Sequence, residues 1–286
     1  MRLFSRRFPP LAAAALLLFC ASPRAMAYVL PGPYLVGMTA RGMGSARTLL
    51  VEQRQVLFGL AESGQGHEIT EILRYRFPLD LRSDVSTAVA RRTFIQRGSR
   101  QVTVIDGRVV PGADHRLDRY RDLLLARSRT ELRNRLVAAD IDIGVSSLGH
   151  DGPVVVYVLG AAFPDTTLPQ LWIEQERFLP VRWILYPSTP SAQGVQQVEF
   201  RFQKWEQLAG GLWYPMRVEC YENQILVREI TVVRTRVDEP FDKGLFDLQQ
   251  FKAATPAPTE KPVAAPQSPD MEEVQKTIED FKKIYQ

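Results

Sequence analysis

An alternation of apolar and polar positions dominates the second half of the chain. Between residues 195 and 205 the apolar side chains of Val198, Phe200 and Phe202 alternate with polar ones, which is the period of a strand with one buried face. The pattern predicts three consecutive strands, at 195–205, 212–221 and 225–237, joined by turns at Gly210-Gly211 and Glu222-Asn223. The segment therefore predicts an antiparallel meander with one buried face and one solvent-exposed face.

The first half of the chain also predicts sheet. Strands are expected at 48–58, 68–77, 84–96, 101–105, 108–110, 141–148 and 154–159, with a further hairpin at 171–186. Asp106-Gly107 is a strong signal for a two-residue hairpin turn. The run 154–159 is apolar at every position, so we expect both of its faces to be covered. In total the patterns predict about ten strands.

Helical patterns precede and interrupt these strands. A short helix is expected at 32–43, before the first strand. Asp114 is positioned to cap a first inserted helix, and Ser128 with Glu131 forms a capping box for a second one. The apolar stripes of the two inserted helices consist of Leu117, Tyr120, Leu123, Leu124, Leu132 and Leu136.

The two ends of the chain differ from its body. Residues 1–27 have a basic start, an apolar core and an Ala-Met-Ala motif, which predicts a signal peptide cleaved after Ala27 and export to the periplasm. Residues 28–252 form the predicted domain. Residues 253–269 are a Pro/Ala-rich linker, and 270–286 has apolar residues at spacings of three and four, which predicts a C-terminal amphipathic helix.

The charge balance argues against a nucleic-acid partner, and the cysteine content argues against a disulfide bond. The formal net charge of +4 comes from the signal peptide, because removing its four arginines leaves 32 basic side chains against 32 acidic ones. We therefore expect no nucleic-acid partner. Cys220 is the single cysteine after residue 27 and lies on the apolar phase of its strand, so we expect a buried thiol without a disulfide.

Residues that carry catalysis or bind metals are sparse. The sequence has three histidines: His67, His115 and His150. They lie in turns or at a helix start, and their spacing does not predict a metal site. Ser146-Ser147 is better explained as two surface hydroxyls, and Asp140 with Asp142 as a helix or strand boundary. We expect no enzyme activity, no metal and no cofactor, since the motifs of serine hydrolases, zinc proteases and P-loop proteins are missing from the sequence.

Four segments stand in a distinctive order. They are LWIEQERFLPVRWILY at 171–186, VEFRF at 198–202, GGLWYPMRV at 210–218 and GLFDL at 244–248. This order resembles the LolA-like superfamily of bacterial envelope proteins, which includes outer-membrane lipoprotein-sorting proteins. The resemblance implies an α+β fold, an open half β-barrel whose inserted helices act as a lid over a hydrophobic cavity. The family's lid-latching arginine is not assigned, because Arg41, Arg47 and Arg54 all lie in the expected region.

The inner face of such a half-barrel is the predicted ligand site. The side chains in phase with it are Leu73, Tyr75, Trp183, Phe200, Phe202, Met216 and Val218. Each of them is also explained as ordinary core of a curved sheet, and a slip of one residue in register would reverse every assignment.

The resemblance implies a periplasmic carrier of acylated ligands, either lipoproteins or lipids. An acyl chain in water costs about 0.8 kcal/mol per methylene group, so such cargo needs a shielded site. Transient membrane contact and an inner- or outer-membrane partner protein fit this role. The alternative is an envelope signalling or scaffold protein on the same fold, in which the helix at 270–286 docks a protein partner.

Overall fold

The structure is a computed structural model and describes residues 29–58, 67–87, 90–110, 116–187 and 196–252. A 13-stranded antiparallel sheet runs in the order β6-β5-β4-β3-β2-β1-β13-β12-β11-β10-β9-β8-β7. Its strands are β1 (Thr48–Leu57), β2 (His67–Arg76), β3 (Asp80–Ser86), β4 (Arg91–Arg97), β5 (Arg100–Ile105), β6 (Arg108–Val109), β7 (Ser146–Asp151), β8 (Val154–Leu159), β9 (Gln170–Glu174), β10 (Pro180–Leu185), β11 (Val198–Gln207), β12 (Trp213–Glu222) and β13 (Ile225–Val237). The helices are α2 (Gly32–Gly42), α3 (Tyr120–Leu125), α4 (Arg129–Ala138) and α5 (Gln249–Lys252), with short 3-10 turns η1 (Arg116–Asp118) and η2 (Ala209–Gly211).

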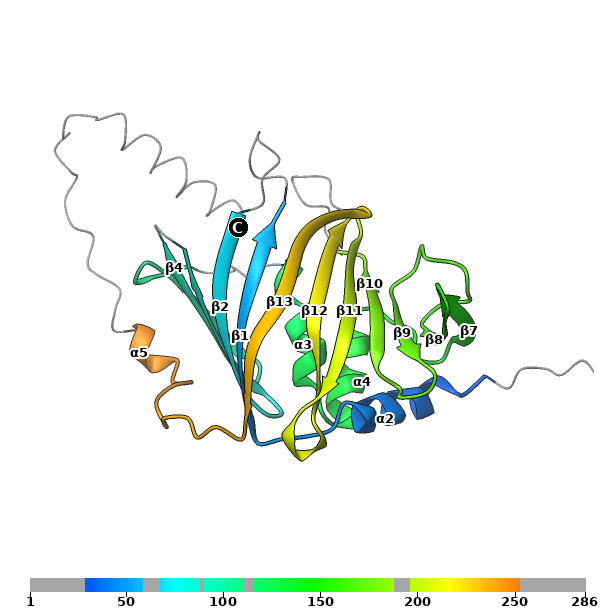
Figure 1. Ribbon diagram of the computed structural model, residues 1–286, viewed down its shortest axis with the longest axis horizontal. Coiled ribbons are helices and arrows are strands. Elements are labelled where there is room, and N and C mark those ends of the chain that lie inside the picture. Colours follow the sequence, from blue (N-terminus) through cyan, green and yellow to red (C-terminus); the bar gives the residue numbers. More distant parts are fainter. Residues whose placement is uncertain (1–28, 59–66, 88–89, 111–115, 188–195, 253–286) are drawn as a thin grey trace, which may run out of the picture.

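The sheet curves around α2, α3 and α4, which lie on its concave side (Figure 1). Strands β1 and β13 pair in the middle and join the two halves of the sheet. One large apolar cluster combines helix residues such as Leu35, Leu124 and Leu132 with the inward-facing residues of the strands. The core therefore sits between the concave face and its helical cover.

The predicted strand phase is present in the register of the central strands. Phe200 pairs with Trp183 on β10 and with Cys220 on β12, while Phe202 pairs with Val218. All five side chains are buried in the main cluster. A period of two places alternate residues on one face, so the apolar residues of β11 and β12 form continuous rows along the inner wall.

Turn chemistry explains where several hairpins close. Asp106 and Gly107 have φ values of 48° and 80°, and Gly210 has a φ of 69°. The two-residue turn at Asp106-Gly107 and the longer connection through η2 at Gly210 both need positive φ, which glycine and aspartate adopt at low cost. Ser128 caps α4 as predicted, because its Oγ accepts a hydrogen bond from the Glu131 backbone N–H at 3.1 Å.

Several sequence predictions need correction. The single strand expected at 84–96 is two strands, β3 and β4, and the sheet has 13 strands where about ten were expected. The first inserted helix is η1 followed by the short α3, and β7 begins at Ser146 instead of residue 141. In β8, Val154 and Val155 are exposed, so only the part from Val156 onward is covered on both faces.

The C-terminal end of the described chain returns to the convex side of the sheet. Phe246 is buried there beneath Arg76, whose Cζ lies 4.4 Å from the ring centroid. Arg82 Nη1 also donates to the Leu245 carbonyl oxygen at 3.1 Å. The predicted signal peptide, linker and terminal helix at 1–27, 253–269 and 270–286, and the capping residue Asp114, lie outside the described residues.

Candidate functional site

The seven residues predicted to line a ligand site all belong to the inner wall. Leu73, Tyr75, Trp183, Phe200, Phe202 and Val218 are buried in the main cluster, and Met216 is half-buried against it. The Trp183 and Phe200 rings are 5.8 Å apart, and Tyr120 of α3 lies 6.2 Å from Phe200. Aromatic rings of the sheet therefore pack against an aromatic ring of α3, and side chains of the helices cover the inner wall. Their role in binding stays a prediction.

Helix α2 packs against α4, and its two ends approach β8, the link between β9 and β10, and β12. At Gly32 an added Cβ would lie 2.0 Å from the Ile143 carbonyl oxygen, and at Gly42 it would lie 2.5 Å from that of Arg177. Glycine is therefore required at both ends of α2 for this close approach. The Trp213 N–H donates to the Met43 carbonyl oxygen at 2.9 Å, which ties the C-terminal end of the helix to β12.

The attachment of α2 relies on apolar packing and backbone hydrogen bonds. Among the described residues α2 makes no ion pair to another element. At its N-terminal side the Ser146 hydroxyl donates to the Leu30 carbonyl oxygen at 2.9 Å. The Thr39 hydroxyl on α2 is buried and has no hydrogen-bond partner. An unsatisfied buried polar group costs about 1–3 kcal/mol. The packed position of α2, in which the Thr39 hydroxyl is buried, is less stable by this amount.

Arg127, in the link between α3 and α4, also holds α2 in place. Its Nη1 donates to the carbonyl oxygens of Met43 at 3.0 Å and Trp213 at 3.3 Å. The guanidinium Cζ lies 5.0 Å from the Phe77 ring centroid. Its Nε and Nη2 have no hydrogen-bond partner, and burial lowers the pKa of Arg127 to about 10. Arg127 therefore links the end of α2 to β12, and two of its three guanidinium nitrogens make no hydrogen bond.

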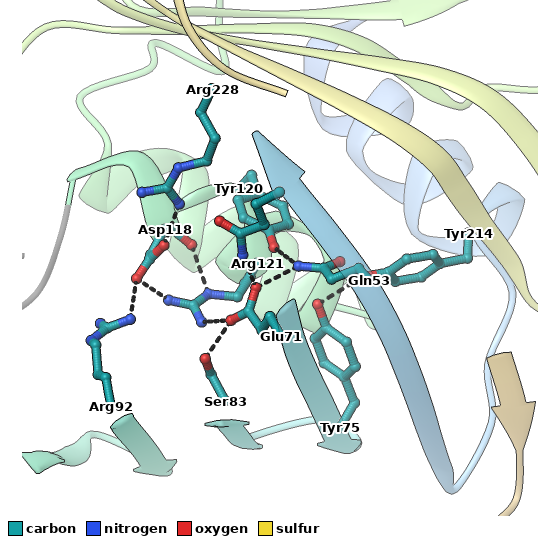
Figure 2. Close-up of polar contacts among 11 residues, drawn as sticks. Gln53, Glu71, Tyr75, Ser83, Arg92, Asp118, Tyr120, Arg121, Tyr214 and Arg228 are labelled. Atoms are coloured by element: carbon teal, nitrogen blue, oxygen red, sulfur yellow. Dashed lines mark hydrogen bonds and ion pairs between the residues drawn. The ribbon is translucent and has the colours of Figure 1, made fainter. Parts of the chain in front are cut away.

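A buried network of charged residues anchors the other part of the cover (Figure 2). Asp118 of η1 binds three arginines, with N–O distances of 2.8 Å to Arg92, 2.5 Å to Arg121 and 2.7 Å to Arg228. Arg121 of α3 continues to Glu71 on β2 at 2.9 Å. All of these side chains are buried. Removing one partner of such a network leaves an uncompensated charge and costs about 3–5 kcal/mol, so η1 and α3 are firmly attached.

Neutral side chains complete this network. Gln53, Gln55 and Ser83 donate to the Glu71 carboxylate, and Gln53 also donates to the Tyr120 hydroxyl at 2.7 Å. These residues lie on β1, β2, β3 and α3, and Figure 2 shows Gln53 and Ser83 pointing toward Glu71. The part of the inner face around β1–β4 holds these polar groups together with apolar residues such as Leu73 and is called here the polar half, and the part around β8–β12 is called the apolar half.

Two buried tyrosines lie where the polar and apolar halves meet. The Tyr75 and Tyr214 hydroxyls are 3.1 Å apart, and burial raises the pKa of both phenols. Both stay neutral at physiological pH and can donate and accept hydrogen bonds without adding charge. The predicted lining residue Tyr75 is thus a polar contact point within an otherwise apolar row.

Two hollows in the described part of the structure lie beside the predicted lining. A polar hollow of about 340 Å³ opens between β3–β5 and the helices, with Gln96, Asp118 and Arg121 in its lining. A groove of about 370 Å³ lies between α2 and the start of α4. None of the seven predicted residues lines either one. A ligand on the apolar wall therefore requires part of the cover to move.

Residues considered for other chemistry have structural roles. Ser147 donates to the Ala161 carbonyl oxygen at 2.9 Å, and Asp142 accepts from the Gly144 N–H at 2.8 Å. Asp140 has a φ of 59° at the exit of α4. No cluster of potential metal ligands and no helix long and apolar enough to span a membrane occurs in the described part of the chain.

Comparison with known proteins identifies the fold. No family model matches the sequence, and no curated protein matches it. A LolA superfamily protein from Nitrosomonas europaea is similar in structure, with a TM-score of 0.52 and 12% identity over 76% of this chain and 97% of that one. A DUF1329 family protein from Desulfovibrio piger gives a TM-score of 0.50 and 12% identity over 77% and 99%. The protein has a LolA-like fold.

A third structure is similar at a lower score. It is a putative outer membrane lipoprotein-sorting protein domain from Vibrio parahaemolyticus, with a TM-score of 0.48 and 10% identity over 77% of this chain and 98% of that one. The LolA-like fold predicted from the order of sequence segments is thereby confirmed from the first two structures. At these identities the likeness establishes the fold alone.

Sequence reasoning about this LolA-like protein missed Arg127, which links the end of α2 to β12. Arg41 donates to Met38 Sδ on its own helix, Arg47 lies beside Asp238, and Arg54 lies beside Glu68, all at exposed positions. None of them ties a helix to the sheet through these contacts, whereas Arg127 does. The sequence signal for Arg127 is weak, because an arginine between two helical patterns is usually solvated.

Proposed function

We propose that this protein is a periplasmic carrier that binds the acyl chain of a lipid or lipoprotein against the apolar half of its concave face. The observation that carries the proposal is the unequal attachment of the cover. Displacing η1 and α3 would break buried ion pairs, whereas displacing α2 breaks apolar contacts, backbone hydrogen bonds and the hydrogen bond from Arg127 to the Met43 carbonyl. Moving α2 can therefore expose apolar surface of the core without leaving a carboxylate unpaired, while Tyr120 of the anchored α3 stays packed on Phe200.

The energetics of exchange support this role. Leu35, Val36 and Met43 are buried when α2 is seated, and exposing three such side chains costs about 5–9 kcal/mol. A chain of about twelve methylene groups recovers about 10 kcal/mol when it leaves water. The two quantities are comparable, so an acyl chain can compete with α2 for the same surface and can be released when α2 returns.

Polar groups beside the wall fit an acyl ester more closely than a pure hydrocarbon. The indole N–H of Trp183 is buried in the inner wall without a hydrogen-bond partner. An ester carbonyl would give this donor an acceptor and remove a penalty of about 1–3 kcal/mol. The role requires no catalytic group, and we propose a binding protein without enzyme activity.

The test begins with the protein purified from periplasm without detergent, followed by mass spectrometry of extracted lipid and titration with a fluorescent fatty acid. Phe202→Ala removes part of the wall and is expected to weaken fatty-acid binding about tenfold. The matched control is Phe246→Ala, which truncates a buried phenylalanine on the convex side. The proposal fails if the wild-type protein carries no lipid and binds no fatty acid, or if both variants lower the affinity equally.

A further inference from the structure

The groove between α2 and α4 combines apolar and basic lining. It has a volume of about 370 Å³ and is called here the α2–α4 groove. Pro33 and Tyr34 of α2 supply the apolar part, and Arg41, Arg127 and Arg129 supply the charge. No carboxylate belongs to its described lining. The groove is therefore a positively charged recess beside the helix that covers the apolar wall.

Arg127 is the buried part of this recess. Its side chain is 9% exposed, and its Nη1 is engaged by two backbone carbonyl oxygens. Its Nε and Nη2 donors have no partner. A buried guanidinium with two unused nitrogens, which carry three N–H groups, is costly, and an oxyanion with several acceptor oxygens would satisfy both nitrogens.

The other deeply buried arginines are arranged differently. Arg92, Arg121 and Arg228 each have an ion pair with Asp118. Arg127 has no carboxylate within ion-pair distance among the described residues. A buried arginine with a carboxylate partner is explained by that partner, whereas the charge of Arg127 has no counterpart within the described fold.

The start of α4 adds donors at the same place. Ser128, the N-cap residue, lines the groove and is followed by a ten-residue helix. The first backbone N–H groups of a helix lack internal partners and carry the positive end of the helix dipole. Phosphate groups bind at such ends when basic side chains are close by.

We propose that the α2–α4 groove binds a phosphate group, held by Arg41, Arg127, Arg129 and the first turn of α4. The inference rests on the proposed carrier function, since the phosphate belongs to the head group of the lipid whose chain lies on the inner wall. A free phosphate ester has the same chemistry, and the experiment separates the two sources. The unused Nε and Nη2 donors of Arg127 supply the contacts, so phosphate binding does not require Arg127 to release the Met43 carbonyl.

The experiment measures dissociation constants by calorimetry for three probes: dodecyl phosphate, dodecanol and glycerol phosphate. Each is titrated into the full-length protein and into an Arg41→Gln/Arg129→Gln double variant. Both arginines are exposed, so their replacement leaves the core intact. The matched control is Arg133→Gln, an exposed arginine of α4 outside the groove lining.

For the wild-type protein we expect dodecyl phosphate to bind most tightly. The double variant should weaken its binding about tenfold and leave dodecanol unchanged, whereas Arg133→Gln should change neither. Glycerol phosphate binding as tightly as dodecyl phosphate would assign the groove to free phosphate esters and overturn the lipid assignment. Equal binding of dodecanol and dodecyl phosphate, unaffected by the double variant, would overturn the phosphate site while the carrier function stands. Failure of all three probes would overturn both.

Discussion

Arg228 and Asp118 are 110 residues apart in the sequence, yet Arg228 Nη1 lies 2.7 Å from Asp118 Oδ1 in the interior. This contact joins β13, at the centre of the sheet, to η1 in the helical cover. Since Asp118 also binds Arg92 and Arg121, one carboxylate connects β4, β13 and α3. The positions of η1 and α3 therefore depend strongly on Asp118, with Glu71 as a second carboxylate that binds Arg121.

Replacing the Asp118 carboxylate should destabilise the fold. We expect Asp118→Asn to lower the free energy of unfolding by about 3–5 kcal/mol, because it removes the shared negative charge from three buried arginines. Urea denaturation followed by tryptophan fluorescence measures the loss. The control is Asp122→Asn, whose partly exposed ion pair with Arg135 at 3.1 Å should contribute less than about 1 kcal/mol. Equal losses for both variants would contradict the anchoring role.

Weakening the packing of α2 against the rest of the domain should raise the affinity for ligand. Leu35→Ala and Leu57→Ala each remove a buried leucine and should each cost about 2–5 kcal/mol in unfolding free energy. Leu35 lies on α2, whereas Leu57 belongs to a separate small cluster. We expect Leu35→Ala alone to raise the affinity for a fluorescent fatty acid, by about tenfold, because it destabilises the closed state that competes with ligand. Unchanged affinity in Leu35→Ala would argue against α2 as the moving part.

The thiol of Cys220 should be protected in the native state. Burial raises the pKa of Cys220 from its ordinary 9.0 to about 12. The folded state therefore holds the proton more tightly than the unfolded state, and this contribution to stability is complete below pH 9 and is lost as the pH rises toward 12. We expect slow labelling by iodoacetamide at pH 8 that becomes fast in denaturant, and a smaller alkaline loss of stability in Cys220→Ala. Rapid labelling of the native protein would contradict this burial.

The segment that returns to the convex side should define the C-terminal limit of the stable domain. A chain ending at Lys252 keeps Phe246 beneath Arg76, so we expect its thermal midpoint to match that of the full-length protein. Phe246→Ala should cost about 3 kcal/mol. The same truncation tests the interaction role expected for 270–286, because loss of a co-purifying protein with unchanged lipid binding would support it. Insolubility of the truncated chain would instead show that the tail covers part of the domain.

Local patterns predicted much of the sheet, and their failures have local causes. Phe200 and Phe202 were assigned to the inner wall because strand alternation depends on neighbouring residues alone. The break between β3 and β4 was missed, since the segment 87–90 contains none of the glycine, proline, asparagine or aspartate residues that usually mark turns.

The charged network was harder to predict. Glu71, Arg92 and Asp118 lie on different elements, and a charged residue in an isolated strand pattern is normally assigned to the solvent face. Their burial is favourable only because the partners meet in three dimensions, which alternation does not encode. The apolar–polar alternation of residues 48–58 is imperfect, because the polar residues Gln53 and Gln55 occupy inward positions. This irregularity was the one sign of the network in the local sequence.

The open sheet also ends in two edges, and their form bears on how the protein behaves at high concentration. Edge strands present unpaired N–H and C=O groups that can template pairing with another molecule. At one edge β6 has two residues, Arg108 and Val109, and offers little length for such pairing. At the other edge β7 contains Gly149 and the polar residues His150 and Asp151, which are poor partners for a flat, apolar strand. Each end of this long sheet thus resists the edge-to-edge growth that leads to fibres.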